Sequence, residues 1–123
     1  FDQHFDLVQR QGELLFAEGD ADDPWGAVAK MDNPMGSQAD IIAAVKAGRF
    51  IRTRTDTDKE TIEVDGPVRL HAALSSGAQM LSTDYPAKVA GVNYVALLPE
   101  GGPARCNPIT APVECTAQAL ERF

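Results

Sequence analysis

The chain has 123 residues, of which 44% are apolar and 24% charged, which is typical of one modest globular domain and not of a disordered segment. Its formal net charge of −7 argues against non-specific binding to nucleic acid, which proteins hold mainly through lysine and arginine. No apolar run approaches the roughly 20 residues that cross a bilayer, so we expect no transmembrane segment.

The first half of the chain alternates helical and extended patterns. In chain order these predict a helix over residues 1–11, a buried strand over 13–17, an acidic loop over 18–24 and an extended apolar segment over 25–31. Asp32-Asn33-Pro34 is then a turn signature. We expect a second helix over residues 37–47, in which the Ser37 hydroxyl caps the first turn and Gly48 ends the helix.

The second half continues this rhythm. It predicts a strand over residues 50–53, a polar loop over 56–65, a helix from Gly66 or Pro67 to Gly77, a strand over 79–82, an extended piece over 93–98 and a Gly/Pro-rich tail over 99–123. Helix, glycine, strand and polar turn thus occur twice, which favours an α/β fold with a parallel sheet. A complete eight-stranded (β/α) barrel needs about 200–250 residues. The chain is therefore either a small open α/β domain or the end of a barrel.

Charged side chains gather where two of the expected strands end. Arg52, Arg54 and Asp56 stand at the end of the first strand, and Asp84 and Tyr85 follow the second. In (β/α) barrels the functional residues lie at the carboxyl ends of the parallel strands. Arg52 and Arg54 share one face of a strand, which in a barrel is either the lumen or the side of the helix layer. We expect the lumen, because burying two charges against the helices costs more free energy. They either bind an anionic small molecule or pair with carboxylates as part of the scaffold.

The remaining candidate residues also allow more than one interpretation each. Asp56 either orients the arginines or contacts the sugar of a substrate, or it is a solvated loop residue. Asp84 and Tyr85 line the site or fix the turn before Pro86, with the Asp84 side chain as a cap. Lys30 interrupts an apolar segment, and it faces either the lumen or the outer layer with its stem buried.

Cys106 and Cys115 stand nine residues apart in the tail and are the only cysteines of the sequence. A metal site needs more ligands than the tail offers, so a disulfide that closes a small loop fits better, although two free thiols remain an alternative. A disulfide implies an oxidising compartment, and we expect a secreted or periplasmic protein. Because Phe1 is not an initiator methionine, we expect the chain to begin after processing or to be cut from a longer one.

The order of several segments resembles the carboxyl-terminal portion of the calcium-dependent phosphoinositide-specific phospholipase C family. The segments are Leu15-Phe16-Ala17, Val28-Ala29-Lys30-Met31-Asp32-Asn33-Pro34, Ile51-Arg52-Thr53-Arg54-Thr55-Asp56-Thr57-Asp58, Ala72–Gln79, Ser82-Thr83-Asp84-Tyr85-Pro86 and Ala104–Pro108. The resemblance implies that residues 1–123 are the last three or so strands, with helices between them, of a partial (β/α) TIM barrel. It also implies that the earlier part of the barrel is missing.

The resemblance further implies a phosphodiesterase that cleaves phosphoinositide head groups with Ca²⁺ as cofactor. The family's catalytic histidines and main calcium ligands lie on the early strands, and neither His4 nor His71 matches them. The segment would then be inactive alone and supply substrate-binding support through Lys30, Arg52, Arg54, Asp56, Asp84 and Tyr85. Two alternatives stay open: a glycerophosphodiester phosphodiesterase of the same superfamily, and a non-catalytic anion-binding α/β module.

Overall fold

The structure is a computed structural model, and it describes residues 18–19, 26, 28–99 and 101–120. The helix expected over residues 1–11, which includes His4, and the strand expected over 13–17 lie outside the described residues.

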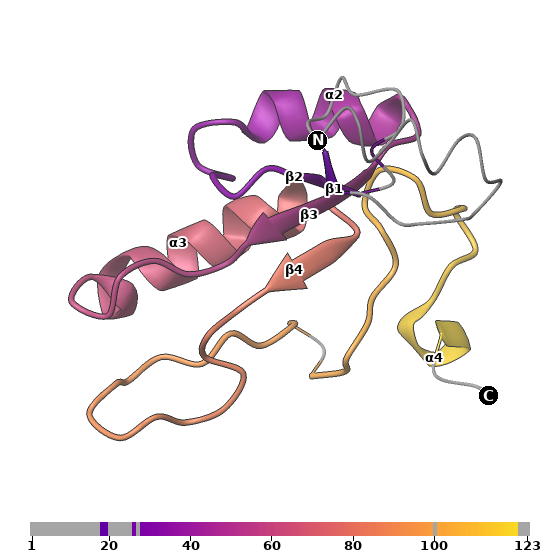
Figure 1. Ribbon diagram of the computed structural model, residues 1–123. Coiled ribbons are helices and arrows are strands. Elements are labelled where there is room, and N and C mark those ends of the chain that lie inside the picture. Colours follow the sequence, from indigo (N-terminus) through magenta and orange to yellow (C-terminus); the bar gives the residue numbers. More distant parts are fainter. Residues whose placement is uncertain (1–17, 20–25, 27, 100, 121–123) are drawn as a thin grey trace, which may run out of the picture.

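Four parallel strands form one sheet, and their order in the sheet follows their order in the chain (Figure 1). The strands are β1 (Glu18–Gly19), β2 (Val28–Lys30), β3 (Phe50–Arg54) and β4 (Met80–Ser82). Helix α2 (Gln38–Lys46) connects β2 to β3, and α3 (Ile62–Ser75) connects β3 to β4. The α/β class with a parallel sheet is therefore as predicted. β1 corrects one expectation, because it lies in the segment predicted as an acidic loop: strand pairing uses backbone groups, which an acidic composition does not remove.

Helix α2 forms where it was predicted, because its apolar residues recur at helical spacing. Ile41 and Val45 lie one turn apart and are 0% and 1% exposed, and they pack with Ala29 of β2 and Ile51 of β3. Burial of one such side chain contributes about 1.5–3 kcal/mol. The expected Ser37 cap is wrong, because the Ser37 side chain makes no capping hydrogen bond and only its backbone carbonyl accepts one, from the N–H of Ile41.

Helix α3 begins at Ile62, inside the segment predicted as a loop, so Pro67 lies within the helix and not at its start. The polar residues that favoured a loop sit on exposed positions of the first turns, while Ile62 is 0% exposed and anchors them to the core. Pro67 removes one backbone hydrogen bond, and packing outweighs this local cost. Gly66 has a steric role, since a Cβ there would lie 2.8 Å from the Tyr94 ring.

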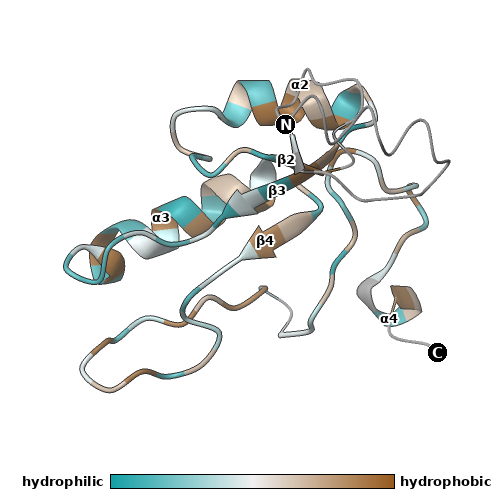
Figure 2. Ribbon diagram, viewed as in Figure 1, coloured by the Kyte–Doolittle hydropathy of each residue, from teal (hydrophilic) through white to brown (hydrophobic). Residues whose placement is uncertain are grey.

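The core consists of two clusters of buried residues. The first joins α2 to the sheet, and the second comprises Ile62, Tyr85 and Tyr94, with Val92 and Ala96 packed against it. Strand β4 is apolar along most of its length (Figure 2). The piece over residues 93–98, expected to be extended, forms no strand, and the N–H of Ala96 donates instead to the Tyr85 carbonyl at 2.9 Å.

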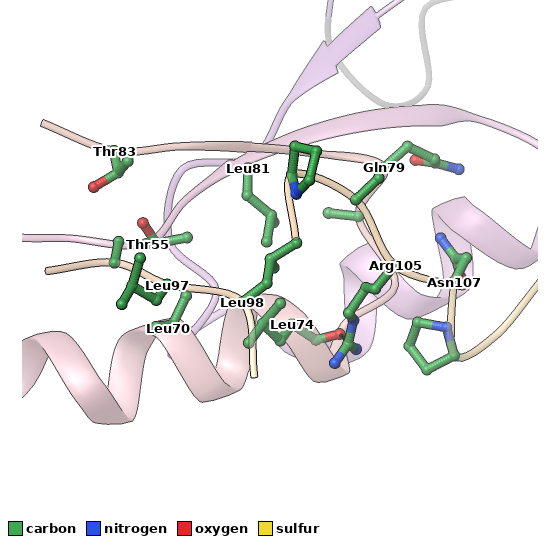
Figure 3. A pocket seen from close by; sticks show the side chains of 15 residues that line it. Thr55, Leu70, Leu74, Gln79, Leu81, Thr83, Leu97, Leu98, Arg105 and Asn107 are labelled. Carbon is green, nitrogen blue, oxygen red and sulfur yellow. Dashed lines mark hydrogen bonds between the residues drawn. The ribbon is translucent and has the colours of Figure 1, made fainter. Parts of the chain in front are cut away.

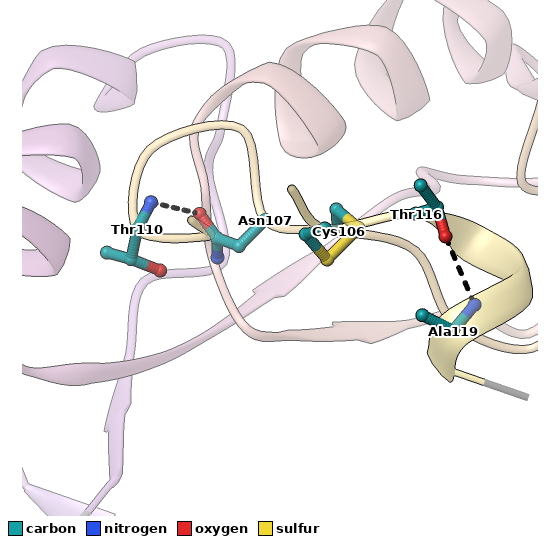
Figure 4. Close-up of a disulfide and its surroundings, with 6 residues drawn as sticks. Cys106, Asn107, Thr110, Thr116 and Ala119 are labelled. Carbon is teal, nitrogen blue, oxygen red and sulfur yellow. Dashed lines mark hydrogen bonds between the residues drawn. A yellow bond between two sulfur atoms is a disulfide. The ribbon is translucent and has the colours of Figure 1, made fainter. Parts of the chain in front are cut away.

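Over its described residues, 101–120, the tail is irregular apart from a short helix that was not predicted, α4 (Ala117–Leu120). Cys106 and Cys115 form a disulfide with a Cα–Cα distance of 5.9 Å (Figure 4). Beside it, the Asn107 side-chain amide donates to the carbonyl of Gly77 at 2.7 Å, which ties the tail to the end of α3. In the part of the chain that the structure describes, no helix is long and apolar enough to cross a membrane.

Candidate functional site

An aspartate lies two residues beyond the last residue of each of the strands β2, β3 and β4. Asp32 follows β2 in this way, Asp56 follows β3 and Asp84 follows β4. Because parallel strands end at the same edge of a sheet, the three carboxylates gather there. Asp56 and Asp84 are at the edge predicted from the sequence, whereas Asp32 was expected only in a turn. The shared spacing after each strand was the signal that could have identified it.

The two arginines of β3 lie on the face of the sheet opposite the core. Ile51 and Thr53 are each 0% exposed, whereas Arg52 and Arg54 alternate with them and are half-buried. The strand register sets Lys30 of β2 opposite Arg52. Lys30, Arg52 and Arg54 therefore project from the same face, which we call the charged face. This agrees with the expected direction of the arginines away from the α2 layer.

Arg52 is paired with the aspartate of the neighbouring strand. Its Nη1 donates to Asp32 Oδ1 at 2.9 Å and to Oδ2 at 3.2 Å. Arg69, from α3, donates through Nη2 to the backbone carbonyl of Asp32 and so holds the loop that carries this carboxylate. Arg69 was not predicted as a site residue, since nothing in its helical position indicates a contact with a loop 37 residues earlier.

Arg54 is paired on the other side, with both remaining aspartates. Its Nε donates to Asp56 Oδ1 at 3.1 Å, and its Nη2 donates to the Asp84 carboxylate. The bond to Asp56, and after it the charge of Asp84, raise the pKa of Arg54. The Asp56 side chain is 0% exposed and that of Asp84 is 71% exposed, so the first carboxylate is internal and the second faces solvent.

Tyr85 lies in the second buried cluster and not among the ion pairs. It is 9% exposed, and its ring packs edge-on against Tyr94 with centroids 5.8 Å apart. The turn before Pro86 is closed by Thr83, whose Oγ1 accepts from the Tyr85 N–H at 2.9 Å. The side-chain cap expected from Asp84 is thus made by Thr83, because the Asp84 carboxylate is occupied by Arg54. A substrate contact of Tyr85 stays a prediction.

The described residues do not fit a calcium site. Ca²⁺ takes 6–8 oxygen ligands, several of them carboxylates. Among the residues that the structure describes, no group of three or more Asp, Glu, His or Cys side chains could hold a metal ion. Asp32, Asp56 and Asp84 each face an arginine instead.

A cavity of about 430 Å³ lies on the opposite side of the sheet from the charged face, between α3, β4 and residues 96–108 (Figure 3). Leu70, Leu74, Leu81, Leu97 and Leu98 converge in it. Arg105, which also lines the cavity, donates to the carbonyl of Leu74 at 2.8 Å. The cavity is therefore mainly apolar and separate from the ion pairs at the strand ends.

A family model described as phosphoinositide phospholipase C, Ca²⁺-dependent, matches residues 3–108. The chain belongs to this family. The match confirms the resemblance drawn from the sequence, and the family's description carries a dependence on calcium. Searches of curated proteins and of solved structures found no match.

Proposed function

We propose that this chain is the carboxyl-terminal part of a (β/α) barrel that cleaves the phosphodiester of phosphoinositides, and that its charged face binds the anionic head group. The single observation that carries this proposal is the convergence of Lys30, Arg52 and Arg54 on one face, at the strand ends of a member of this family.

Two features of the sheet support a barrel. The order β1-β2-β3-β4 contains no reversal, whereas doubly wound sheets reverse at a switch point. The face with the arginines also carries exposed apolar residues: Phe50, at the amino end of β3, is 41% exposed, and Met80 of β4, which lies opposite Arg52, is 49% exposed. Further inward-facing strands would cover these apolar residues, as in the packed interior of a barrel.

The ion pairs support head-group binding because they fix the arginines before any ligand arrives. Asp32 holds Arg52 through a single nitrogen, Nη1, and a guanidinium carries five N–H donors. A planar guanidinium suits bidentate recognition of phosphate. The carboxylates of Asp32, Asp56 and Asp84 add hydrogen-bond acceptors for inositol hydroxyls. We therefore assign Arg52 and Arg54 to the phosphate and hydroxyls, with Asp56 as a positioning residue that orients Arg54.

In the proposed reaction the inositol 2-hydroxyl attacks phosphorus and displaces diacylglycerol, which leaves a cyclic inositol phosphate. A general base accepts the hydroxyl proton and a general acid protonates the leaving oxygen. Neither group is assigned here, since the one described histidine, His71, is an exposed residue on α3. Calcium would supply positive charge when bound, with ligands from outside the described residues. The part of the chain described here then binds and orients the substrate, in a secreted or periplasmic protein whose disulfide suits an oxidising compartment.

The test compares two substrates in the full-length protein that contains these residues. We expect cleavage of phosphatidylinositol in preference to glycerophosphoinositol, and Arg52→Ala to lower kcat/KM about tenfold to a hundredfold through loss of charged hydrogen bonds. Arg52→Lys keeps the charge and should recover part of this loss.

Lys46→Ala is the matched control, because Lys46 is an exposed cation in the last turn of α2, at the amino end of β3. It should leave kcat/KM unchanged. Full activity in Arg52→Ala, with folding checked by circular dichroism, would contradict the binding role. A preference for glycerophosphoinositol would instead favour the related glycerophosphodiester phosphodiesterase.

A further inference from the structure

The cavity between α3, β4 and residues 96–108 follows β4 from one end to the other (Figure 3). Gln79, just before the strand, and Thr83, just after it, both line the cavity. Leu81, between them, lies opposite Thr53 of β3, which is buried on the face of the sheet that turns away from the charged face. The cavity is therefore elongated, and it is separate from the site to which we assign the phosphoinositide head group.

The apolar side chains of the cavity remain accessible. Leu70 and Leu74 of α3, Leu81 of β4 and Leu98 are half-buried, and Leu97 is 61% exposed. These side chains converge without filling the space between them (Figure 3). The volume of about 430 Å³ lies within the range of about 300–1,000 Å³ that is usual for small-molecule sites. A bound aliphatic chain would cover the leucines and remove their apolar surface from water.

Arg105 makes one end of the cavity positive. Among the described residues that line the cavity, it is the one that carries a charge. In Figure 3 it lies toward the same end as Asn107, away from Thr83. Its Nη2 donates to the Leu74 carbonyl at 2.8 Å, and it forms no ion pair with any residue that the structure describes. A guanidinium has five N–H donors, so Arg105 keeps donors for a ligand.

The wall that carries Arg105 is held in place on both sides. The disulfide between Cys106 and Cys115 constrains the chain next to it. The Asn107 amide donates to the Gly77 carbonyl at 2.7 Å, and the Ile109 side chain packs so closely that a Cβ at position 77 would lie 2.6 Å from it. The guanidinium is therefore positioned before any ligand binds, which lowers the entropy cost of binding.

We propose that this cavity binds a single-chain aliphatic carboxylate, with the chain along the leucines and the carboxylate on Arg105. A guanidinium binds a carboxylate through two parallel hydrogen bonds. A carboxylate fits better than a phosphate monoester, because the lining offers one positive charge and a second negative charge would stay unpaired beside apolar groups. This site does not depend on the proposed cleavage of phosphoinositides, because it lies on the other face of the sheet.

The test is isothermal titration calorimetry of the full-length protein with octanoate below its micelle concentration. We expect saturable binding with a negative heat-capacity change, because apolar surface is buried. Octanol has the same chain without the charge, and it should bind about tenfold more weakly because it lacks the charged hydrogen bonds. Octyl phosphate should also bind more weakly than octanoate.

Three variants locate the ligand, and circular dichroism checks that each of them folds. Arg105→Gln keeps a donor for the Leu74 carbonyl but removes the charge, so octanoate should bind about tenfold more weakly and octanol as before. Lys88→Gln is the matched control, because Lys88 is an exposed cation that does not line the cavity; it should bind octanoate as the wild type does. Leu97→Asp changes an exposed lining residue and should weaken the binding of both ligands.

Wild-type protein that does not bind octanoate, or that binds octanol or octyl phosphate as tightly, would overturn the proposal. An equal loss in Lys88→Gln and Arg105→Gln would also overturn it, because the charge would then act at a distance and not as a contact. If Arg105→Gln fails to fold, the comparison of the three ligands in the wild type and the effect of Leu97→Asp decide the matter. Binding is measured without turnover, so a failure of the proposed phosphodiesterase activity leaves this result unaffected.

Discussion

The backbone N–H of Asp84 donates to the carboxylate of Asp56 at 2.6 Å. This bond joins the ends of β3 and β4, and Arg54 closes the ring by donating to both carboxylates. A buried carboxylate with two donors, one of them charged, stabilises its neighbours mainly because removing it leaves them unpaired. The arginine is thereby fixed at the edge of the sheet where we propose that the head group binds.

Asp56→Ala should lower the free energy of unfolding by about 2–3 kcal/mol, because the Arg54 guanidinium and the Asp84 N–H both lose a buried acceptor. Urea unfolding followed by circular dichroism measures this difference. Asp58→Ala is the matched control: Asp58 is exposed and lies two residues further along the same loop. Its change should stay within about 0.5 kcal/mol. Equal effects of the two substitutions would contradict the role given to Asp56.

The disulfide between Cys106 and Cys115 closes a loop with a sequence separation of 9. Replacing both cysteines with alanine should cost about 2.5 kcal/mol, mainly because the unfolded chain regains the freedom that the bond removes. Chemical unfolding of the double variant, compared with the oxidised wild type, gives the value. Dithiothreitol should lower the stability of the wild type and leave the double variant unchanged. A response of the double variant to the reductant would show that the effect has another source.

The pKa of Tyr94 is raised by burial and, second, by the negative charge of Asp56, while hydrogen bonding with the Thr55 side chain acts in the opposite direction. An unfolded tyrosine loses its proton near pH 10, and the folded protein keeps it to a higher pH. Between these two pKa values the folded state binds more protons, so the free energy of unfolding falls as the pH rises above about 10.

Tyr94→Phe should remove this part of the pH dependence. We expect the difference in unfolding free energy between the wild type and Tyr94→Phe to shrink, or to change sign, between pH 9 and 11. Tyr85, which is the other tyrosine, and the lysines are present in both proteins, so their contributions cancel in that difference. A difference that stays constant across this range would contradict the burial of the Tyr94 hydroxyl.

Local sequence signals were sufficient for the regular elements that pack against the sheet. The spacing of Ile41 and Val45 predicted α2, and the glycine at position 77 marked the end of α3. The signals failed where packing overrides local preference. Helix α3 begins before Pro67, within a polar segment. Its first turn is stabilised by the buried Ile62 and by the close packing of Tyr94 against Gly66.

For the candidate site, the sequence alone determined which residue types stand at the ends of the strands and that Arg52 and Arg54 share a face. Both follow from the period of a strand, which is a local property. Only the tertiary structure decided the partners, Asp32 for Arg52 and Asp56 with Asp84 for Arg54. It also brought Arg69 to the Asp32 loop. Apart from Arg54–Asp56, which are two residues apart, these pairs join residues 20 to 37 positions apart, and such contacts depend on how the strands align side by side, which no local pattern encodes.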